Sequence, residues 1–228
     1  MAVRLAHDGH DVALVQRGDA PRALAAAVAL GRRATVHRTD LADPDAAAAV
    51  VDAVVDAHGR LDALVLNAGT IDRHDAIDFP LDVWRRTLDL NLTSPFLLAQ
   101  AAARSYRAQG SGGRIVFIAS VLAFQGGIRV PAYAATKGAV RQLVMALANE
   151  WAADGIGVNA VAPGYVDTEL TVALREDAER RAALDARIPA GRWATPEDVA
   201  GAVAFLCSPD AAYVHGQTLA VDGGWLAR

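Results

Sequence analysis

The feature that most constrains the fold of this chain is the regular alternation of short apolar strand patterns with helix patterns along its whole length. Such alternation is typical of βαβ units, in which parallel strands form a sheet and helices cover its faces. It predicts a doubly wound, parallel-sheet α/β fold in a single domain, residues 1–228. The expected strands are 11–16, 35–37, 61–66, 114–119, 157–161 and 218–221, and the expected helices are 21–30, 43–57, 81–108, 131–153 and one that starts at 195.

Composition excludes several classes of protein. The net charge of −4 offers no basic excess to neutralise phosphates, so we expect no nucleic-acid partner. No apolar run reaches the roughly 20 residues that a membrane-spanning helix needs, so we expect no membrane partner. The one cysteine, Cys207, lies in an apolar stretch and fits a reducing compartment. We therefore expect a cytoplasmic protein, and no metal site.

Lysine occurs only once. Of the 22 lysine and arginine residues, only Lys137 is a lysine. A lysine retained in such an arginine-rich composition suggests a task for a compact ammonium group, because a guanidinium differs in reach and hydrogen-bonding geometry. Chance survival at a neutral position is the alternative.

Four polar residues form a candidate catalytic set. Tyr133 and Lys137 lie four residues apart on an expected helix, so their side chains share one face. Ser120 follows the strand 114–119, and the carboxyl ends of parallel strands face the ligand crevice. Asn91 lies within the expected helix 81–108, in N-L-T-S-P-F. A Tyr-x-x-x-Lys pair alone is weak evidence, but the whole set in this order is specific.

Two further motifs complete a recognisable pattern, N-A-G at 67–69 and P-G-Y-V-D-T at 163–168. With the four polar residues, they resemble the short-chain dehydrogenase/reductase family across essentially the whole chain. The resemblance implies that Tyr133 exchanges a proton with the substrate oxygen and that Ser120 hydrogen-bonds that oxygen. It implies that Lys137 holds the nicotinamide ribose and lowers the tyrosine pKa. It also implies that Asn91 supports a proton-relay water.

The same resemblance implies a nicotinamide dinucleotide cofactor. The resemblance favours NAD, and we expect NAD. NADP is the alternative, because Arg17 could accommodate a 2′-phosphate at the position where an acidic residue would select NAD. The expected cofactor contacts are Gln16, Arg17, Asp40, Leu41, Asn67, Ala68, Gly69, Tyr133, Lys137, Pro163, Gly164, Val166 and Thr168.

Three segments, 124–133, 188–193 and 220–228, carry a closer resemblance to the 2-deoxy-D-gluconate 3-dehydrogenase branch, also described as 2-dehydro-3-deoxy-D-gluconate 5-dehydrogenase. The branch implies a sugar-acid substrate. Arg129 is our candidate partner for the substrate carboxylate, with Gln125 and Tyr165 as further substrate contacts. The alternative for Arg129 is anchoring a loop to a neighbouring subunit.

The polar, arginine-rich stretch of about 165–192 is expected to form a lid over the ligand, or else a solvated helical excursion. It contains Arg175, Arg180, Arg181, Arg187 and Arg192. The resemblance further implies a homotetramer assembled through the helices around 82–108 and 132–153.

A Rossmann fold also needs a first strand followed by a glycine-rich turn that holds the pyrophosphate. Counting back from Gln16 places that turn before residue 1, and residues 1–9 resemble the tail of the following helix. We therefore expect the first strand and its glycine-rich loop to be missing from these 228 residues, and the chain as written not to turn over substrate. Either Met1 is an internal methionine of a longer protein or the truncation is real.

Two other functions remain open at this point. Within the same class, the chain could be a 3-oxoacyl carrier-protein reductase or another sugar dehydrogenase. From a different class, a truncated chain could be a catalytically inactive subunit that acts in assembly or regulation.

Overall fold

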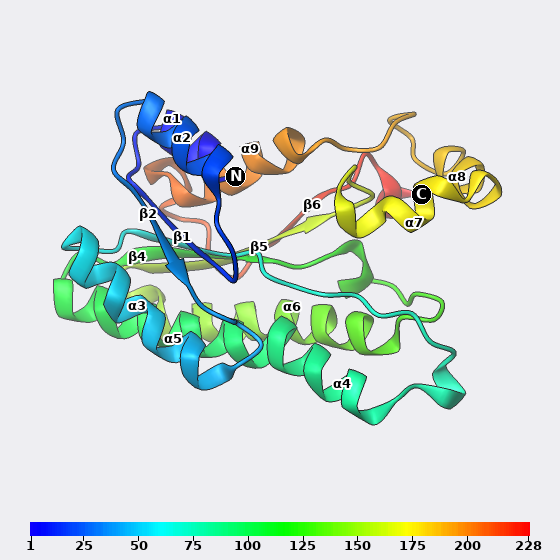
Figure 1. Ribbon diagram of the computed structural model, residues 1–228, viewed down its shortest axis with the longest axis horizontal. Helices are drawn as coiled ribbons and strands as arrows, with labels where there is room; N and C mark the ends of the chain where they lie inside the picture. The colour runs from blue at the N-terminus through cyan, green and yellow to red at the C-terminus, as the bar shows by residue number, and fades with distance from the viewer.

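The computed structural model describes residues 1–228 apart from the side chains of Leu170, Ala173 and Arg175, and it has three layers, with parallel strands between two sets of helices (Figure 1). All strand pairs are parallel, as the alternation predicts. The strands are β1 (Val12–Gln16), β2 (Ala34–Arg38), β3 (Ala63–Leu66), β4 (Gly113–Ile118), β5 (Ile156–Pro163) and β6 (Thr218–Val221).

Helices cover both faces of the strand layer. One face carries α3 (Pro44–His58), α4 (Leu81–Leu88), α5 (Ser94–Gln109) and α6 (Pro131–Trp151), and the other carries α1 (Ala2–His7), α2 (Pro21–Ala29) and α9 (Pro196–Cys207) (Figure 1). The short helices α7 (Val172–Glu176) and α8 (Ala178–Asp185) lie at one end, near the C-terminus (Figure 1). No helix among the described residues is long and apolar enough to span a membrane.

The predicted start of α9 is confirmed by its capping contacts. The Thr195 side chain accepts a hydrogen bond from the Asp198 backbone amide, and the Asp198 carboxylate accepts one from the Thr195 amide. Pro196 follows at the first helical position, where a missing amide costs nothing. These local signals fix where the helix begins.

The expected helix 81–108 is interrupted rather than kinked. A π-helical segment, Asp89–Thr93, joins α4 to α5, and Pro95 lies in the first turn of α5, where it removes no required amide. The segment carries the buried Asn91. The interruption therefore falls at a candidate catalytic residue, and Pro95 lies at the start of the second helical segment.

The main core lies where β4 and β5 pack against α5 and α6. Ile115, Phe117, Val158 and Ala160 are essentially inaccessible to solvent and belong to one large apolar cluster. Both strands are buried on both faces, which explains their nearly continuous apolar sequences. This part of the molecule is a rigid support for the residues that follow β4 and β5.

The strands form two separate sheets. β1 pairs with β2, whereas β3, β4, β5 and β6 form a second sheet in that order. Between them lies a cavity of about 650 Å³, here called the intersheet cavity, lined by every residue of β1 and of β3. One edge of β1 and one edge of β3 therefore have no strand partner among the described residues. The expected absence of a first strand and its glycine loop stays a prediction.

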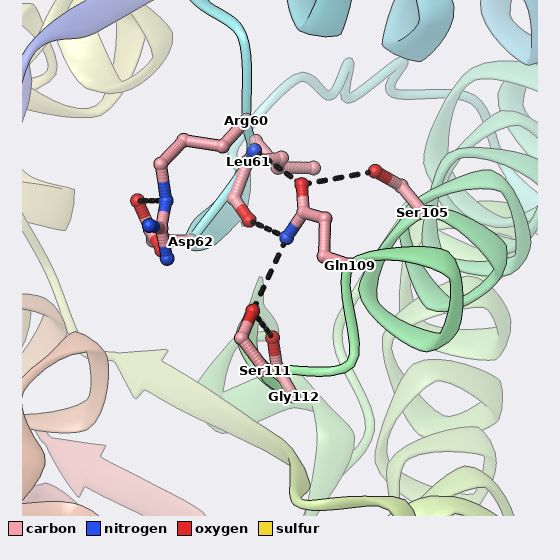
Figure 2. Close-up of polar contacts among 7 residues, drawn as sticks. All are labelled: Arg60, Leu61, Asp62, Ser105, Gln109, Ser111 and Gly112. Carbon is pink, nitrogen blue, oxygen red and sulfur yellow. Dashed lines mark hydrogen bonds and ion pairs between the residues drawn. The ribbon is translucent and has the colours of Figure 1, made fainter.

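A polar clamp holds the start of β3 despite its unpaired edge (Figure 2). The Gln109 side chain accepts a hydrogen bond from the Leu61 amide at 2.8 Å and donates one to the Leu61 carbonyl at 2.8 Å. Arg60 Nε donates to Asp62 Oδ1 at 3.0 Å beside it. Gln109 ends α5, so the clamp fastens the residues just before this strand to a helix of the main core.

The stretch 165–192 is helical and anchored at its ends. Val166 forms a parallel bridge with Ala194, whose amide donates to the Tyr165 carbonyl at 2.9 Å. Between these anchors lie α7 and α8, and Leu184 of α8 packs with Trp225 and Val121. The Arg175 side chain lies outside the described part of the chain. Whether this stretch acts as a lid stays a prediction.

Candidate active site

The four predicted catalytic residues come from three neighbouring elements. Ser120 follows β4, Tyr133 and Lys137 lie on the first turns of α6, and Asn91 lies in the π-helical segment. Ser120, Tyr133 and Lys137 line a cavity of about 610 Å³, here called the catalytic cavity. The Lys137 Nζ is 5.5 Å from the centre of the Tyr133 ring. The structure thus brings together in one cavity residues from the end of β4 and from α6, whereas Asn91 is not among the lining residues.

Tyr133 is a weak acid in this setting. Burial raises the pKa of its phenol above the usual value of 10.0, because the phenolate loses its hydration. A hydrogen bond with Ser120 and the positive charge of Arg73 both act in the opposite direction. Ser120 and Arg73 supply the opposing effects in this structure, and the expected contribution of Lys137 to lowering the pKa of Tyr133 stays a prediction.

Lys137 faces a backbone carbonyl. Its Nζ donates a hydrogen bond to the Ile118 carbonyl oxygen at 2.7 Å, and only 5% of the residue is exposed. Burial lowers the pKa of this amine from 10.5 to about 8. An ammonium group with one hydrogen-bond partner has donors to spare, so Lys137 is suited to binding hydroxyl groups of a ligand in the cavity.

Asn91 is fully engaged by its neighbours. Its Oδ1 accepts from the Thr70 amide at 2.8 Å, and its Nδ2 donates to the Thr70 carbonyl at 2.9 Å. A longer contact of 3.4 Å joins Nδ2 to the Thr136 hydroxyl. Asn91 therefore fixes the segment after β3 against α6, and its part in a proton relay stays a prediction.

Two glycines of the cavity wall pack closely against neighbouring protein groups. A Cβ on Gly69 would lie 3.3 Å from Asn91 Oδ1 and 3.8 Å from Lys137 Nζ, so a side chain would fill the space beside the amine. At Gly164, a Cβ would lie 2.8 Å from the Asp222 Cα. The free donors of Lys137 fit a hydroxyl-bearing group such as a ribose.

The expected cofactor residues gather at the carboxyl ends of the strands. Gln16 ends β1 and Arg17 follows it, Asp40 and Leu41 follow β2, and the segment 67–69 follows β3. Asn67, Gly69, Pro163, Gly164, Val166 and Thr168 line the catalytic cavity, and Gln16, Leu41, Asn67 and Ala68 line the intersheet cavity. Asn67 is common to both cavities, as is Met1. The roles of these residues remain predictions.

The substrate candidates separate into two groups. Gln125 and Tyr165 line the catalytic cavity. Arg129 is not among its lining residues, because its Nε lies 3.0 Å from Asp75 Oδ1 in a solvent-exposed ion pair. Arg129 could reach a substrate carboxylate only if this pair opened, so its proposed role stays a prediction that the geometry does not favour.

The positive charge of the catalytic cavity was not predicted from the sequence. Its lining includes Arg73, Lys137, Arg180 and Arg187, and no aspartate or glutamate among the described side chains. Arg73 stands between the N-A-G motif and an expected helix, where no motif pointed to it. A cavity with cationic side chains only is suited to an anionic ligand.

Comparison with known proteins identifies the class. The family described as enoyl-(acyl carrier protein) reductase matches residues 1–226. The 2-dehydro-3-deoxy-D-gluconate 5-dehydrogenase of Escherichia coli strain K12 is 46% identical over 228 residues, covering 100% of this chain and 90% of the relative. The chain therefore belongs to the short-chain dehydrogenase/reductase family, as its motifs predict.

Solved structures similar to this chain belong to the same class of protein. One from Agrobacterium tumefaciens, described as a candidate 2-deoxy-D-gluconate 3-dehydrogenase with bound NADP, has a TM-score of 0.94 and 49% identity, covering 100% of this chain and 90% of that one. A gluconate 5-dehydrogenase from Burkholderia cenocepacia J2315, in complex with NADP and tartrate, has a TM-score of 0.91 and 37% identity, covering 100% and 89%. These similar proteins are dehydrogenases of sugar acids.

Proposed function

We propose that this protein interconverts a secondary alcohol and a ketone on a sugar acid, such as 2-deoxy-D-gluconate or 2-dehydro-3-deoxy-D-gluconate, with a nicotinamide dinucleotide as its coenzyme. The observation that carries the proposal is the placing of Ser120, Tyr133 and Lys137 in one cavity whose described charged side chains are all cationic. The relatives named above support the choice of substrate class.

Each catalytic side chain has a defined task in this proposal. When bound, the coenzyme supplies or accepts the hydride. The Tyr133 hydroxyl passes its proton to the ketone oxygen during reduction and takes it back from the alcohol during oxidation. Ser120 donates a hydrogen bond to the same oxygen, and Lys137 binds ribose hydroxyls. Asn91 acts through Thr70 and Thr136 by holding the cavity wall in place.

The pKa of Tyr133 sets the expected pH dependence. Alcohol oxidation needs the phenolate, and burial raises the pKa of this phenol. The oxidation rate should therefore rise with pH above neutrality, whereas ketone reduction, which needs the protonated phenol, should fall.

A coenzyme and substrate panel tests the function. We would follow formation of reduced coenzyme by the natively expressed protein with NAD or NADP and four substrates: 2-deoxy-D-gluconate, 2-dehydro-3-deoxy-D-gluconate, a neutral sugar and a 3-hydroxyacyl thioester. Turnover confined to sugar acids is expected. Preferred turnover of the thioester would instead favour an acyl carrier-protein reductase, and no turnover of any of them would favour an inactive subunit.

The choice between NAD and NADP depends on one arginine in our proposal. We expected NAD, but the similar solved structures hold NADP. Arg17 follows β1 with an exposed side chain, and Asp19 forms an ion pair with Arg38. Asp19 is therefore occupied, whereas Arg17 is placed to accept a 2′-phosphate. A lower KM for NADP than for NAD, reversed by Arg17→Ala, is the expected result.

We also propose that an additional parallel strand fills the intersheet cavity in the active enzyme and joins the two sheets. The unpaired edges of β1 and β3 face this cavity, and unpaired strand edges are a strong drive for strand addition. The strand would lie at the topological switch point, where its carboxyl end meets Asn67 and the catalytic cavity.

The intact mass of the natively expressed protein tests this second proposal. An added strand with its turn predicts a mass above 23.8 kDa by about 2 kDa, together with slow hydrogen exchange of the β1 amides. A mass of 23.8 kDa with rapid exchange at β1 would contradict it.

Location and assembly extend the proposal. We infer a cytoplasmic protein that forms a homotetramer through the outer faces of α4, α5 and α6. Support comes from its family and from the single buried cysteine, whose thiol pKa burial raises to about 12. Native mass spectrometry should give four copies, and a monomer would contradict this assignment.

A further inference from the structure

The side of the catalytic cavity next to the C-terminus is built from residues that the catalytic roles leave unused. Trp225 and Arg187 both line the cavity, the first from the C-terminal segment and the second just after α8. Trp225 is 2% exposed and packs in a buried cluster with Val121, Leu184 and Ile188. Its position is therefore fixed by the fold.

Arg187 is held against this tryptophan. Its guanidinium carbon lies 3.8 Å from the centre of the Trp225 ring, within the range of a cation–π contact. Two other arginines of this stretch are committed to acids, Arg181 to Asp185 and Arg192 to Asp198. No ion pair of Arg187 is found among the described residues, so its guanidinium donors are available to a ligand.

The indole N–H of Trp225 lacks a hydrogen-bond acceptor among the described residues. The group is also buried. A buried donor without a partner is costly, and indole N–H groups usually find an acceptor when buried. This donor is enclosed by its neighbours, so the part of Trp225 that acts on the cavity is its ring, on which Arg187 lies.

Charge favours an anion at the same wall. The charges of Arg180 and Arg187 oppose the rise in the pKa of Tyr165 that its burial causes. The Tyr165 ring lies 4.8 Å from that of Trp225, centre to centre. The Arg187 guanidinium, held on the Trp225 ring, can therefore present its free N–H donors edge-on to a planar carboxylate.

We propose that Arg187 and Trp225 form the subsite for the substrate carboxylate. The Arg187 guanidinium pairs with the carboxylate, and the Trp225 ring holds that guanidinium in place. The inference rests on the proposed sugar-acid function and assigns the two ends of that substrate. The carboxylate lies at this wall, and the reacting carbon, several bonds away along the sugar, lies at Tyr133.

Binding measurements test the subsite without requiring turnover. We would titrate the full chain with 2-deoxy-D-gluconate and with the matching neutral alditol, and follow the heat released. Arg187→Met should weaken gluconate binding at least about tenfold and change alditol binding by less than about twofold. Arg187→Lys should recover part of the loss, and Trp225→Phe should weaken gluconate binding about threefold or more.

Arg181→Met is the matched control, because Arg181 lies on α8, pairs with Asp185 and is not among the residues that line the cavity. It should leave both affinities unchanged. Equal melting temperatures would show that the Arg187 variants are folded; if Trp225→Phe unfolds, the Arg187 pair of variants decides the question.

Two results would overturn the inference while leaving the dehydrogenase function intact. One is an unchanged gluconate affinity in Arg187→Met, and the other is a selective loss in Arg73→Met but not in Arg187→Met. Failure of the natural chain to bind any sugar acid would instead refute the proposed function, and the subsite with it.

Discussion

The two cavities of this molecule are similar in size but differ in construction. The catalytic cavity, about 610 Å³, lies beside the four-stranded sheet and is lined by side chains already held by hydrogen bonds, such as Ser120 and Lys137. The intersheet cavity, about 650 Å³, is lined by strands whose facing edges have no partner among the described residues. The catalytic cavity is therefore a preformed site, whereas the intersheet cavity is a gap between two sheets whose facing edges are unpaired.

The difference teaches that a catalytic arrangement does not require a continuous sheet beneath it. Ser120 depends on β4, and β4 is paired on both sides, by β3 and β5. The expected cofactor contacts Gln16 and Arg17 depend on β1, which is paired on one side only. We therefore expect changes near the catalytic cavity to alter chemistry and stability strongly, and changes near the intersheet cavity to have smaller effects.

The largest expected effect is on chemistry. Tyr133→Phe removes the hydroxyl that carries the proton and should lower kcat by at least about 10²–10⁴-fold in the natively expressed enzyme. Coenzyme binding, measured by fluorescence of the reduced form, should be nearly unchanged. Comparable turnover by the Phe variant would place the acid/base function elsewhere.

The next effect is on stability and depends on pH. Because burial lowers the pKa of Lys137 to about 8, the unfolded state binds more protons than the folded state between pH 8 and 10.5. The free energy of unfolding should therefore rise with pH in this window, by about 3 kcal/mol relative to Lys137→Met. Urea unfolding of both proteins across the window measures it, and parallel curves would contradict it.

The close contact between Gly164 and Asp222, beside the catalytic cavity, should also affect stability. Gly164→Ala places a Cβ 2.8 Å from the Asp222 Cα, which should cost about 1–3 kcal/mol and raise the KM for coenzyme. Gly138→Ala, one residue after Lys137, meets nothing within 4 Å and should stabilise the helix by up to about 1 kcal/mol. Equal melting temperatures for the two variants would show that the Pro163–Thr168 turn has more freedom than the structure indicates.

A smaller effect compares the two cavities directly. Val158→Ala opens a void in the main core, whereas Val51→Ala enlarges a cavity that already exists. The first should cost about 1 kcal/mol more than the second. In a natively expressed protein that carries an additional strand, this gap should close, because Val51 would then be packed.

The smallest effect concerns Arg129. Its exposed ion pair with Asp75 contributes little, so Arg129→Ala should change the KM for a sugar acid by less than about twofold. A tenfold rise in that KM would restore Arg129 as the carboxylate partner and weaken the case for Arg187.

The sequence predicted elements whose signals are local. The start of α9 is predicted by the capping residues Thr195 and Asp198 together with Pro196. The apolar run after Gly113 predicts β4. The grouping of Ser120, Tyr133 and Lys137 followed from the rule that strand ends share one edge, together with family resemblance.

What the sequence could not give depends on contacts between distant segments. Arg73 and Arg187 became cavity residues only when the segment after β3 and the end of α8 met the same space. The pKa of Tyr133 depends on a balance between burial and neighbouring groups, which spacing along one helix does not reveal. The pairing of Arg129 with Asp75 likewise joins two loops that no pattern connects.

The most direct test of the central claim is the rate of coenzyme reduction by the natively expressed protein in the presence of 2-deoxy-D-gluconate. We predict steady turnover that rises with pH and is abolished by Tyr133→Phe. Absence of turnover with either NAD or NADP, from a protein that binds both coenzyme and sugar acid, would contradict the claim that this cavity is a dehydrogenase site.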